Sequence, residues 1–148
     1  MTQLSDHFTL EEAAFSSTAV RNGIANVPDT TQLANMKVAA KSMDQVRDYL
    51  ELPIHVDSWL RVATLNGSVG GATHSDHMDG WAIDFICPAF GTPLQICQAL
   101  LKSGIKWHRL IFEGNWCHIS FNPLMKQQVE TATFDTKGVA TYTVGLPS

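Results

Sequence analysis

Two histidines and one aspartate have the types and the spacing of a metal site. Asp84 falls within residues 81–86, which are otherwise strongly apolar, and His77 lies seven residues before it. An ionised carboxylate in an apolar strand costs several kcal/mol unless a cation compensates its charge. With His118, the set offers two imidazoles and a carboxylate, and about three such ligands hold a catalytic zinc ion. The sequence therefore predicts a Zn2+ site at His77, Asp84 and His118.

Glu113 is the candidate general base beside this site. Residues 107–113 and 116–121 are expected to form two strands joined at Gly114-Asn115, because a turn with glycine first suits a type II′ hairpin. In that register Glu113 lies opposite Trp116 and Ile111 lies opposite His118, with all four side chains on one face. Glu113 would then stand beside the metal without binding it, as hydrolysis requires, whereas the Asn115 side chain cannot accept a proton.

Each of these side chains also has an ordinary structural interpretation. The histidines can be satisfied by hydrogen bonds, Asp84 can form a buried salt bridge, and Glu113 can be solvated at a hairpin end. His74 and Asp76 could support the site, but we favour their being solvated loop residues. His108 is expected on the opposite face of the hairpin, outside the metal site.

The elements that must position these residues follow from local patterns. Capping signals and apolar spacing predict helices over residues 9–15, 17–22, 29–49 and 93–103, the last with Leu94, Ile96, Cys97, Leu100 and Leu101 inward. Strands are expected over residues 53–59 and 81–86, with a weak hairpin over residues 131–144 and an irregular glycine-rich loop over residues 66–71. The prediction is an α+β fold in which short N-terminal helices and one long helix pack on a small antiparallel sheet.

Composition excludes several classes of protein. The 148 residues fit a single domain, with 45% hydrophobic residues, 16% charged residues and a formal net charge of −4. No basic stripe is present to bind nucleic acid, and no apolar run is long enough to cross a bilayer. The three cysteines are expected to be core residues without a disulfide, and the N-terminal segment lacks the pattern of a signal peptide.

The motif around the candidate ligands resembles a known family. Ser75-x-His77-x-x-Gly80-x-Ala82-x-Asp84, followed by Trp116-x-His118, is similar to the zinc D-alanyl-D-alanine carboxypeptidases and phage L-alanyl-D-glutamate endolysins, the LAS-type murein peptidases. The resemblance extends over residues 4–145 and is closest to the short single-domain branch. Its outer parts are Leu4-Ser5-x-His7-Phe8-Thr9-Leu10-x-Glu12, Gly23-Ile24-x-Asn26-x-Pro28, Ser58-x-x-Arg61 and Asn66-x-x-Val69-Gly70-Gly71.

The resemblance implies a zinc peptidase that acts on peptidoglycan stem peptides, with an acidic residue of the last hairpin as the base. It places Arg61 near the substrate, where a guanidinium can hold a carboxylate or polarise a carbonyl, and Ser75 beside the substrate backbone. Trp116 either lines the cleft or fills core. Several members carry the acid three residues before the last histidine, where this chain has Asn115, so the hairpin argument decides for Glu113.

Other consequences of the resemblance are expectations about setting. The chain is expected to be a monomeric phage endolysin or related murein hydrolase, held in the host cytoplasm before release to the cell wall, or carried on a virion. Whether it cleaves D-Ala-D-Ala, L-Ala-D-Glu or a cross-link stays open. The alternative is a non-catalytic module that contains zinc and binds cell-wall peptide.

Overall fold

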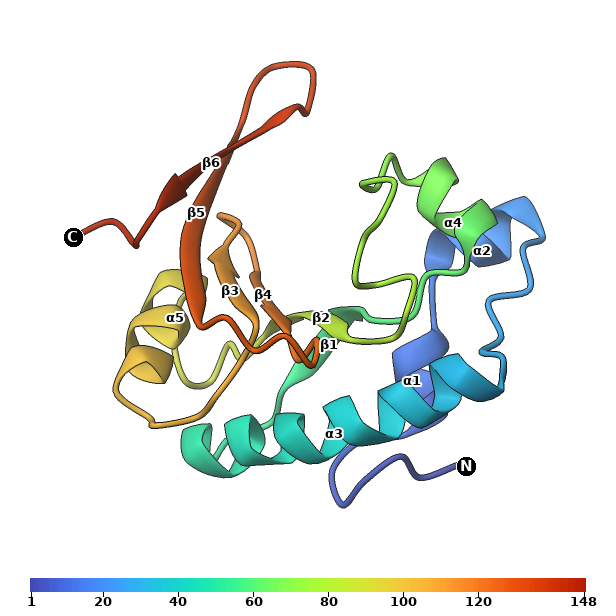
Figure 1. Ribbon diagram of the computed structural model, residues 1–148, viewed down its shortest axis with the longest axis horizontal. Coiled ribbons are helices and arrows are strands. Elements are labelled where there is room, and N and C mark those ends of the chain that lie inside the picture. Colours follow the sequence, from blue (N-terminus) through green and yellow to red (C-terminus); the bar gives the residue numbers. More distant parts are fainter.

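A six-stranded sheet and five helices make up the fold, which a computed structural model describes for residues 1–148 (Figure 1). This architecture confirms the predicted α+β class. The helices are α1 (Leu10–Ala14), α2 (Ser17–Asn22), α3 (Thr30–Leu50), α4 (Ala63–Ser68) and α5 (Pro93–Leu101). The strands are β1 (His55–Ser58), β2 (Ala82–Ile86), β3 (Arg109–Phe112), β4 (Cys117–Ser120), β5 (Gln128–Phe134) and β6 (Ala140–Val144).

The sheet has the strand order β1-β2-β4-β3-β5-β6, and one pair departs from the predicted antiparallel arrangement. β5 runs parallel to β3, whereas all other neighbours are antiparallel. The reason is that the chain leaves β4 and turns back at residues 121–127, where Gln127 N donates to the Trp107 carbonyl and Gln128 N to the His108 carbonyl. β5 therefore starts at the same end of the sheet as β3.

One row of residues crosses five strands in register. Asp84 on β2 is the partner of Ser58 on β1 and of His118 on β4, and Ile111 on β3 is the partner of both His118 and Glu130 on β5. Because side chains alternate along a strand, the neighbouring positions face the other side of the sheet. The candidate ligands Asp84 and His118 thus share one face, and the opposite face carries apolar residues.

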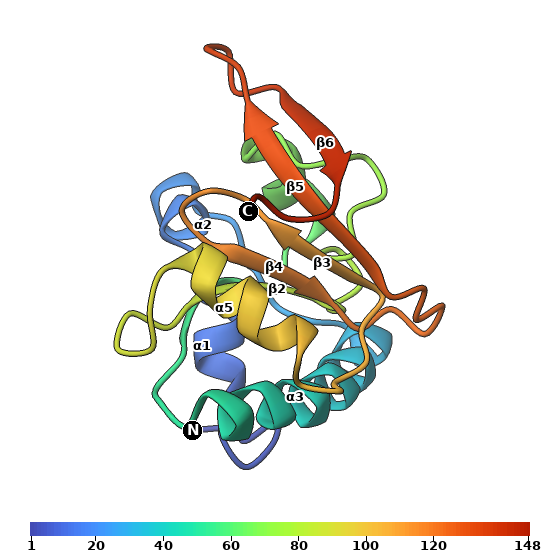
Figure 2. The same ribbon diagram turned by 90° about the vertical axis from the view of Figure 1, so that its left-hand side faces the viewer.

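The core lies on that opposite face. Figure 2 shows α5 against the strands and α3 beneath them. The buried cluster joins residues of both helices to the sheet, among them Met36, Met43, Ile96, Phe85 and Ile119. A capping box starts α3, in which the Asp29 carboxylate accepts from Gln32 N and the Gln32 side chain accepts from Asp29 N. The buried contacts with the sheet place α3 beneath the strands that form the cleft (Figure 1).

Two local predictions were wrong. Helix α4 includes residues 66–68, which were expected to belong to an irregular loop. The Asn66 side chain is buried and donates a hydrogen bond to the Ala72 carbonyl, which ties the end of the helix to the residues that follow it. Leu101 was expected inward but is 49% exposed. Successive helical positions differ by about 100°, so Leu101 turns out of the face that Leu100 buries.

The three cysteines are free and buried, and the Cys97 and Cys117 sulfurs lie 3.4 Å apart. None of the helices combines the length and the apolar composition that crossing a membrane requires.

Candidate metal centre

His77, Asp84 and His118 converge from three parts of the chain. His118 Nδ1 lies 2.9 Å from Asp84 Oδ1, and His77 Nε2 lies 3.2 Å from Asp84 Oδ2. All three ligand atoms are within 4.8 Å of one another. The side chains are largely buried, with 2% of His77 and 11% each of Asp84 and His118 exposed. Strand pairing explains the position of Asp84 and His118, whereas His77 comes from the loop before β2.

The backbone before that loop orients the His77 ring. His77 Nδ1 lies 2.8 Å from the Trp59 carbonyl oxygen, which can only accept a hydrogen bond, so Nδ1 carries the proton. The lone pair is then on Nε2, which is buried, lacks a hydrogen-bond partner and faces Asp84. A carbonyl that fixes the ring through the second nitrogen is typical of metal-binding histidines.

These residues fit a divalent metal ion. Two imidazoles and a carboxylate are a donor set that zinc prefers, and the ligand atoms of a tetrahedral zinc site are about 3.3 Å apart. The two short separations, 2.9 and 3.2 Å, are close to that value. A cation would also give the unpartnered His77 Nε2 an interaction. A metal ion therefore suits the donor atoms, their spacing and their burial.

The ligands perturb one another's protonation. Burial on its own would raise the pKa of Asp84, but the charges and hydrogen bonds of His77 and His118 hold it well below its usual value. Burial lowers the pKa of His77. Burial also acts to lower the pKa of His118, but the hydrogen bond and charge of Asp84 outweigh it and raise that pKa. The carboxylate is therefore ionised and His77 neutral near pH 7, which are the forms that bind metal.

Asp76 anchors the loop that carries His77, contrary to the prediction that it is solvated. Its Oδ2 accepts from Ser120 Oγ at 2.7 Å and its Oδ1 from Asn122 Nδ2 at 3.0 Å. Ser120 lies on β4, two residues after His118, so one carboxylate links the loop to the strand that holds another ligand. His74, by contrast, is exposed as expected.

Helix α3 holds the same loop from the other side. Gln32 Nε2 donates to the Met78 carbonyl at 2.7 Å and Asn35 Nδ2 to the Asp79 carbonyl at 3.0 Å. Gly80 has φ of +82°, and a Cβ there would come within 2.6 Å of Met36 Cγ, so both its conformation and its contact with α3 require glycine. Sequence reasoning missed Gln32 and Asn35, and their polar positions on the capped helix were the only signal.

Glu113 and Trp116 stand where the hairpin argument predicts. Ile111 and His118 are register partners, and Glu113 N donates to the Trp116 carbonyl at 3.1 Å. The Trp116 indole N–H donates to Glu113 Oε2, and burial raises the pKa of Glu113. These four residues line the same cleft as His77, whereas Asn115 is exposed at the turn and does not line it.

Arg61 and Ser75 lie on the opposite side of the cleft. Arg61 Nη2 is 3.9 Å from Asp84 Oδ2, Nη1 donates to Asn66 Oδ1 at 3.4 Å, and the buried Nε has no partner. Ser75 Oγ accepts from His77 N at 3.2 Å, so this hydroxyl shapes the loop as well as lining the cleft. The substrate-binding roles of Arg61, Ser75 and Trp116 stay predictions.

His108 differs from its expected place. His108 was expected on the face of the hairpin opposite the metal site, but its side chain lines the larger cavity of the cleft. It lies just before β3, where the alternation of side chains along a strand does not apply. The His108 Nδ1 accepts from Lys126 N at 3.3 Å, and the ring is not in the ligand group.

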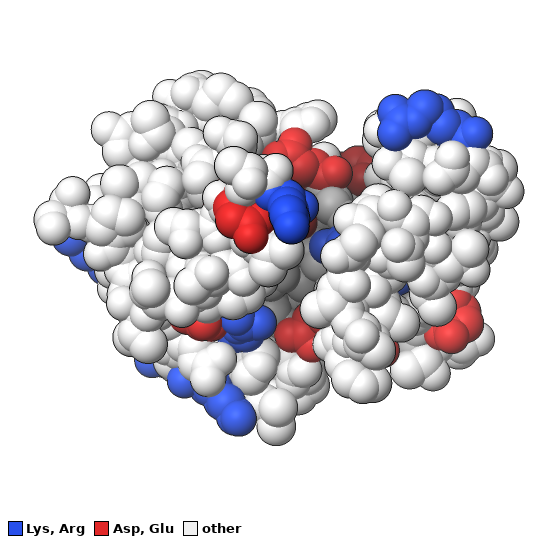
Figure 3. Space-filling model, turned by 90° about the horizontal axis from the view of Figure 1, so that it is seen from above, with Lys and Arg blue, Asp and Glu red and all other residues white.

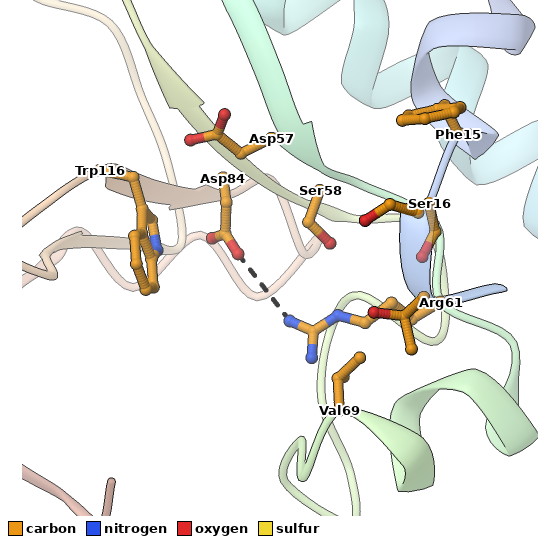
Figure 4. Close-up of a pocket in the computed structure, with 10 residues that line it drawn as sticks. Phe15, Ser16, Asp57, Ser58, Arg61, Val69, Asp84 and Trp116 are labelled. Carbon is orange, nitrogen blue, oxygen red and sulfur yellow. Dashed lines mark ion pairs between the residues drawn. The ribbon is translucent and has the colours of Figure 1, made fainter. Parts of the chain in front are cut away.

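The cleft consists of two adjoining cavities. The larger, about 1000 Å³, contains the three candidate ligands and Glu113 and is bounded by residues 69–77 on one side and the β5–β6 hairpin on the other. Figure 3 shows the hollow from above, with acidic and basic side chains along it. The smaller, about 340 Å³, adjoins it at the residues that both share, which are Arg61, Val69, Asp84 and Trp116 (Figure 4).

Comparison with known proteins identifies the family of this chain. No curated protein matches the chain. A family model described as Peptidase M15 matches residues 6–120, a range that contains all the candidate ligands, Glu113 and Arg61 and ends before β5. M15 peptidases are metallopeptidases, which agrees with the donor set found here. Since the match spans most of the sequence, the chain belongs to the peptidase M15 family.

Proposed function

We propose that this protein is a zinc-dependent peptidase that hydrolyses peptide bonds in the stem peptides of peptidoglycan, as a phage endolysin or a related murein hydrolase. The observation that carries the proposal is the convergence of His77, Asp84 and His118 at the floor of a cleft that also contains the Glu113 carboxylate. The membership of a peptidase family supports hydrolysis of a peptide. The sequence motif around these residues supports the choice of zinc and of cell-wall peptides.

The loop before β2 and the sheet would each contribute ligands to the metal. His77 would bind through Nε2, because its Nδ1 hydrogen is held by the Trp59 carbonyl. Asp84 and His118 would bind from neighbouring strands. A zinc ion held there would supply a Lewis acid that polarises the scissile carbonyl and lowers the pKa of water.

Glu113 would move the proton. Its carboxylate accepts the proton of the attacking water and then delivers it to the amine that leaves when the peptide C–N bond breaks. The Trp116 N–H occupies Oε2, which leaves Oε1 to accept that proton. A raised pKa suits both steps, because a base with a pKa nearer neutrality also serves as an acid after it has been protonated.

Arg61 would stabilise charge on the substrate. Its guanidinium borders both cavities. A fixed cation in a largely buried setting can donate to the carbonyl oxygen as negative charge develops there. Asp84 holds the guanidinium on the cleft side, at 3.9 Å.

Digestion of purified peptidoglycan by the zinc-loaded protein tests the proposal. We expect new free amines, with mass spectrometry of the fragments locating the cleaved bond, and we expect no release after treatment with a chelator. Binding to sacculi without release of amines would overturn the proposal in favour of a non-catalytic module.

A further inference from the structure

The cleft continues past the candidate metal site into the smaller cavity. His77, His118 and Glu113 line only the larger cavity, so the smaller one lies beyond Asp84. Its remaining walls are the start of α2 with the residues before it, and the end of β1. Figure 4 shows Trp116 on one side of this space and Phe15, Ser16 and Val69 on the other, with the Arg61–Asp84 pair between them.

The walls combine apolar surface with hydroxyl groups. Phe15 and Val69 are 65% and 43% exposed, and with Trp116 they offer apolar contact to a chain of methylene groups. The hydroxyl groups come from Ser16, Ser17, Thr18 and Ser58. A side chain with an aliphatic stem and a polar end suits such walls.

Asp57 gives the cavity a carboxylate that the metal site does not use. Its carboxylate points away from Arg61 (Figure 4), and its ion-pair partner is His55 Nε2 at 3.4 Å, on a side chain that is 70% exposed. Arg61 is the only Lys or Arg in the lining, and it lies against Asp84. Burial raises the pKa of the Asp57 carboxyl, as expected where no strong cationic partner offsets the loss of solvent.

We propose that the smaller cavity is a substrate subsite that receives a side chain ending in an ammonium group, which Asp57 binds. The proposal rests on the proposed function, which it deepens. The ligand chemistry is that of a diamino acid residue, with one amine in the peptide chain and one free.

Two matched peptides test the ammonium site. Stem-like peptides that carry lysine or Nε-acetyl-lysine at the diamino position have nearly the same shape and differ in charge. We expect the zinc-loaded protein to cleave the lysine peptide with a kcat/KM about five- to tenfold higher. Asp57→Asn should remove this preference mainly through KM, and Asp57→Glu should restore part of it. Asp6→Asn, which removes an exposed carboxylate outside both cavities, should keep the full preference.

Equal cleavage of the two peptides by the unmodified protein, or a preference that survives Asp57→Asn, would overturn the ammonium site. These outcomes leave the proposed function intact, whereas no cleavage of any peptide or of peptidoglycan would remove both.

Discussion

The indole N–H of Trp116 donates a hydrogen bond to Glu113 Oε2 across the turn that joins β3 to β4. The same ring packs against Phe134 of β5, with centroids 6.3 Å apart. One aromatic side chain thus connects the candidate base to a strand outside the family match. This contact fixes which carboxylate oxygen of Glu113 is free.

Trp116→Phe tests that contact, because phenylalanine keeps an aromatic ring against Phe134 and removes the donor. The hydrogen bond lowers the pKa of Glu113, so its loss should raise that pKa further. We expect kcat to fall about tenfold and the acidic limb of the kcat/KM profile to move to higher pH. Steady-state kinetics from pH 4 to about 8 check this, and an unmoved limb would contradict it.

Glu113→Gln should separate metal binding from catalysis. The amide keeps the size of the side chain and cannot accept the proton, so we expect kcat to fall by about 10²- to 10⁴-fold with zinc content unchanged. Asn115→Ala, at the exposed turn two residues along, is the control and should keep full activity. Undiminished hydrolysis by Glu113→Gln would show that another group is the base.

His118→Ala should lose both metal and activity. One imidazole fewer leaves two protein ligands, and we expect most of the zinc to be lost and kcat/KM to fall by at least about 10³-fold. Plasma mass spectrometry of the purified protein measures the zinc, and circular dichroism checks the fold. His7→Ala, which changes an exposed histidine outside both cavities, should keep both properties. Full zinc content in His118→Ala would exclude His118 as a ligand.

Asp76→Ala should loosen the loop without removing a ligand. The Ser120 and Asn122 side chains would lose their acceptor, at a cost of about 1–3 kcal/mol in the free energy of unfolding. Urea denaturation of the zinc-loaded protein measures this. Asp79→Ala changes a neighbouring exposed carboxylate and should cost less than about 0.5 kcal/mol. Equal stability of the two variants would contradict the anchoring role.

Glu113 should make the metal-free protein less stable as pH rises. Burial raises its folded-state pKa above the ordinary 4.5. Below about pH 4.5 the carboxyl is protonated in both the folded and the unfolded state, so it does not change the free energy of unfolding. As pH rises, ionisation becomes more favourable in the unfolded state than in the folded state, where the charge is buried, and the free energy of unfolding falls. Glu113→Gln should therefore be more stable than the unmodified chelated protein at pH 7, with the difference vanishing toward pH 4. Thermal unfolding across this range measures it, and a less stable variant at pH 7 would refute it.

The sequence predicts those parts of the molecule that depend on short stretches of chain. The helix caps, the β3–β4 register and the shared face of Glu113 and His118 follow from alternation and turn chemistry within about fifteen residues. The convergence of His77, Asp84 and His118 was predicted from the free-energy cost of burying an unpaired carboxylate and from the motif that resembles a known family.

The remaining parts depend on contacts between distant segments. The Trp59 carbonyl that orients His77 is a backbone group, and every residue type has one, so no side chain marks it. Asp76 reaches Ser120 and Asn122 across more than forty residues. The parallel pairing of β5 with β3 depends on the direction in which residues 121–127 turn back, which periodicity does not determine.

Because the His77 loop and the sheet would supply ligands to the same ion, metal binding would be coupled to folding. The unfolded chain has no preformed site, so a metal ion would bind the folded protein and shift the population toward it. A free zinc concentration about 100 times the dissociation constant would add about 2.7 kcal/mol of stability. The lifetime of the folded protein would then follow the zinc content of its surroundings, and scarcity of the ion would remove the enzyme through unfolding and proteolysis as well as through lost activity.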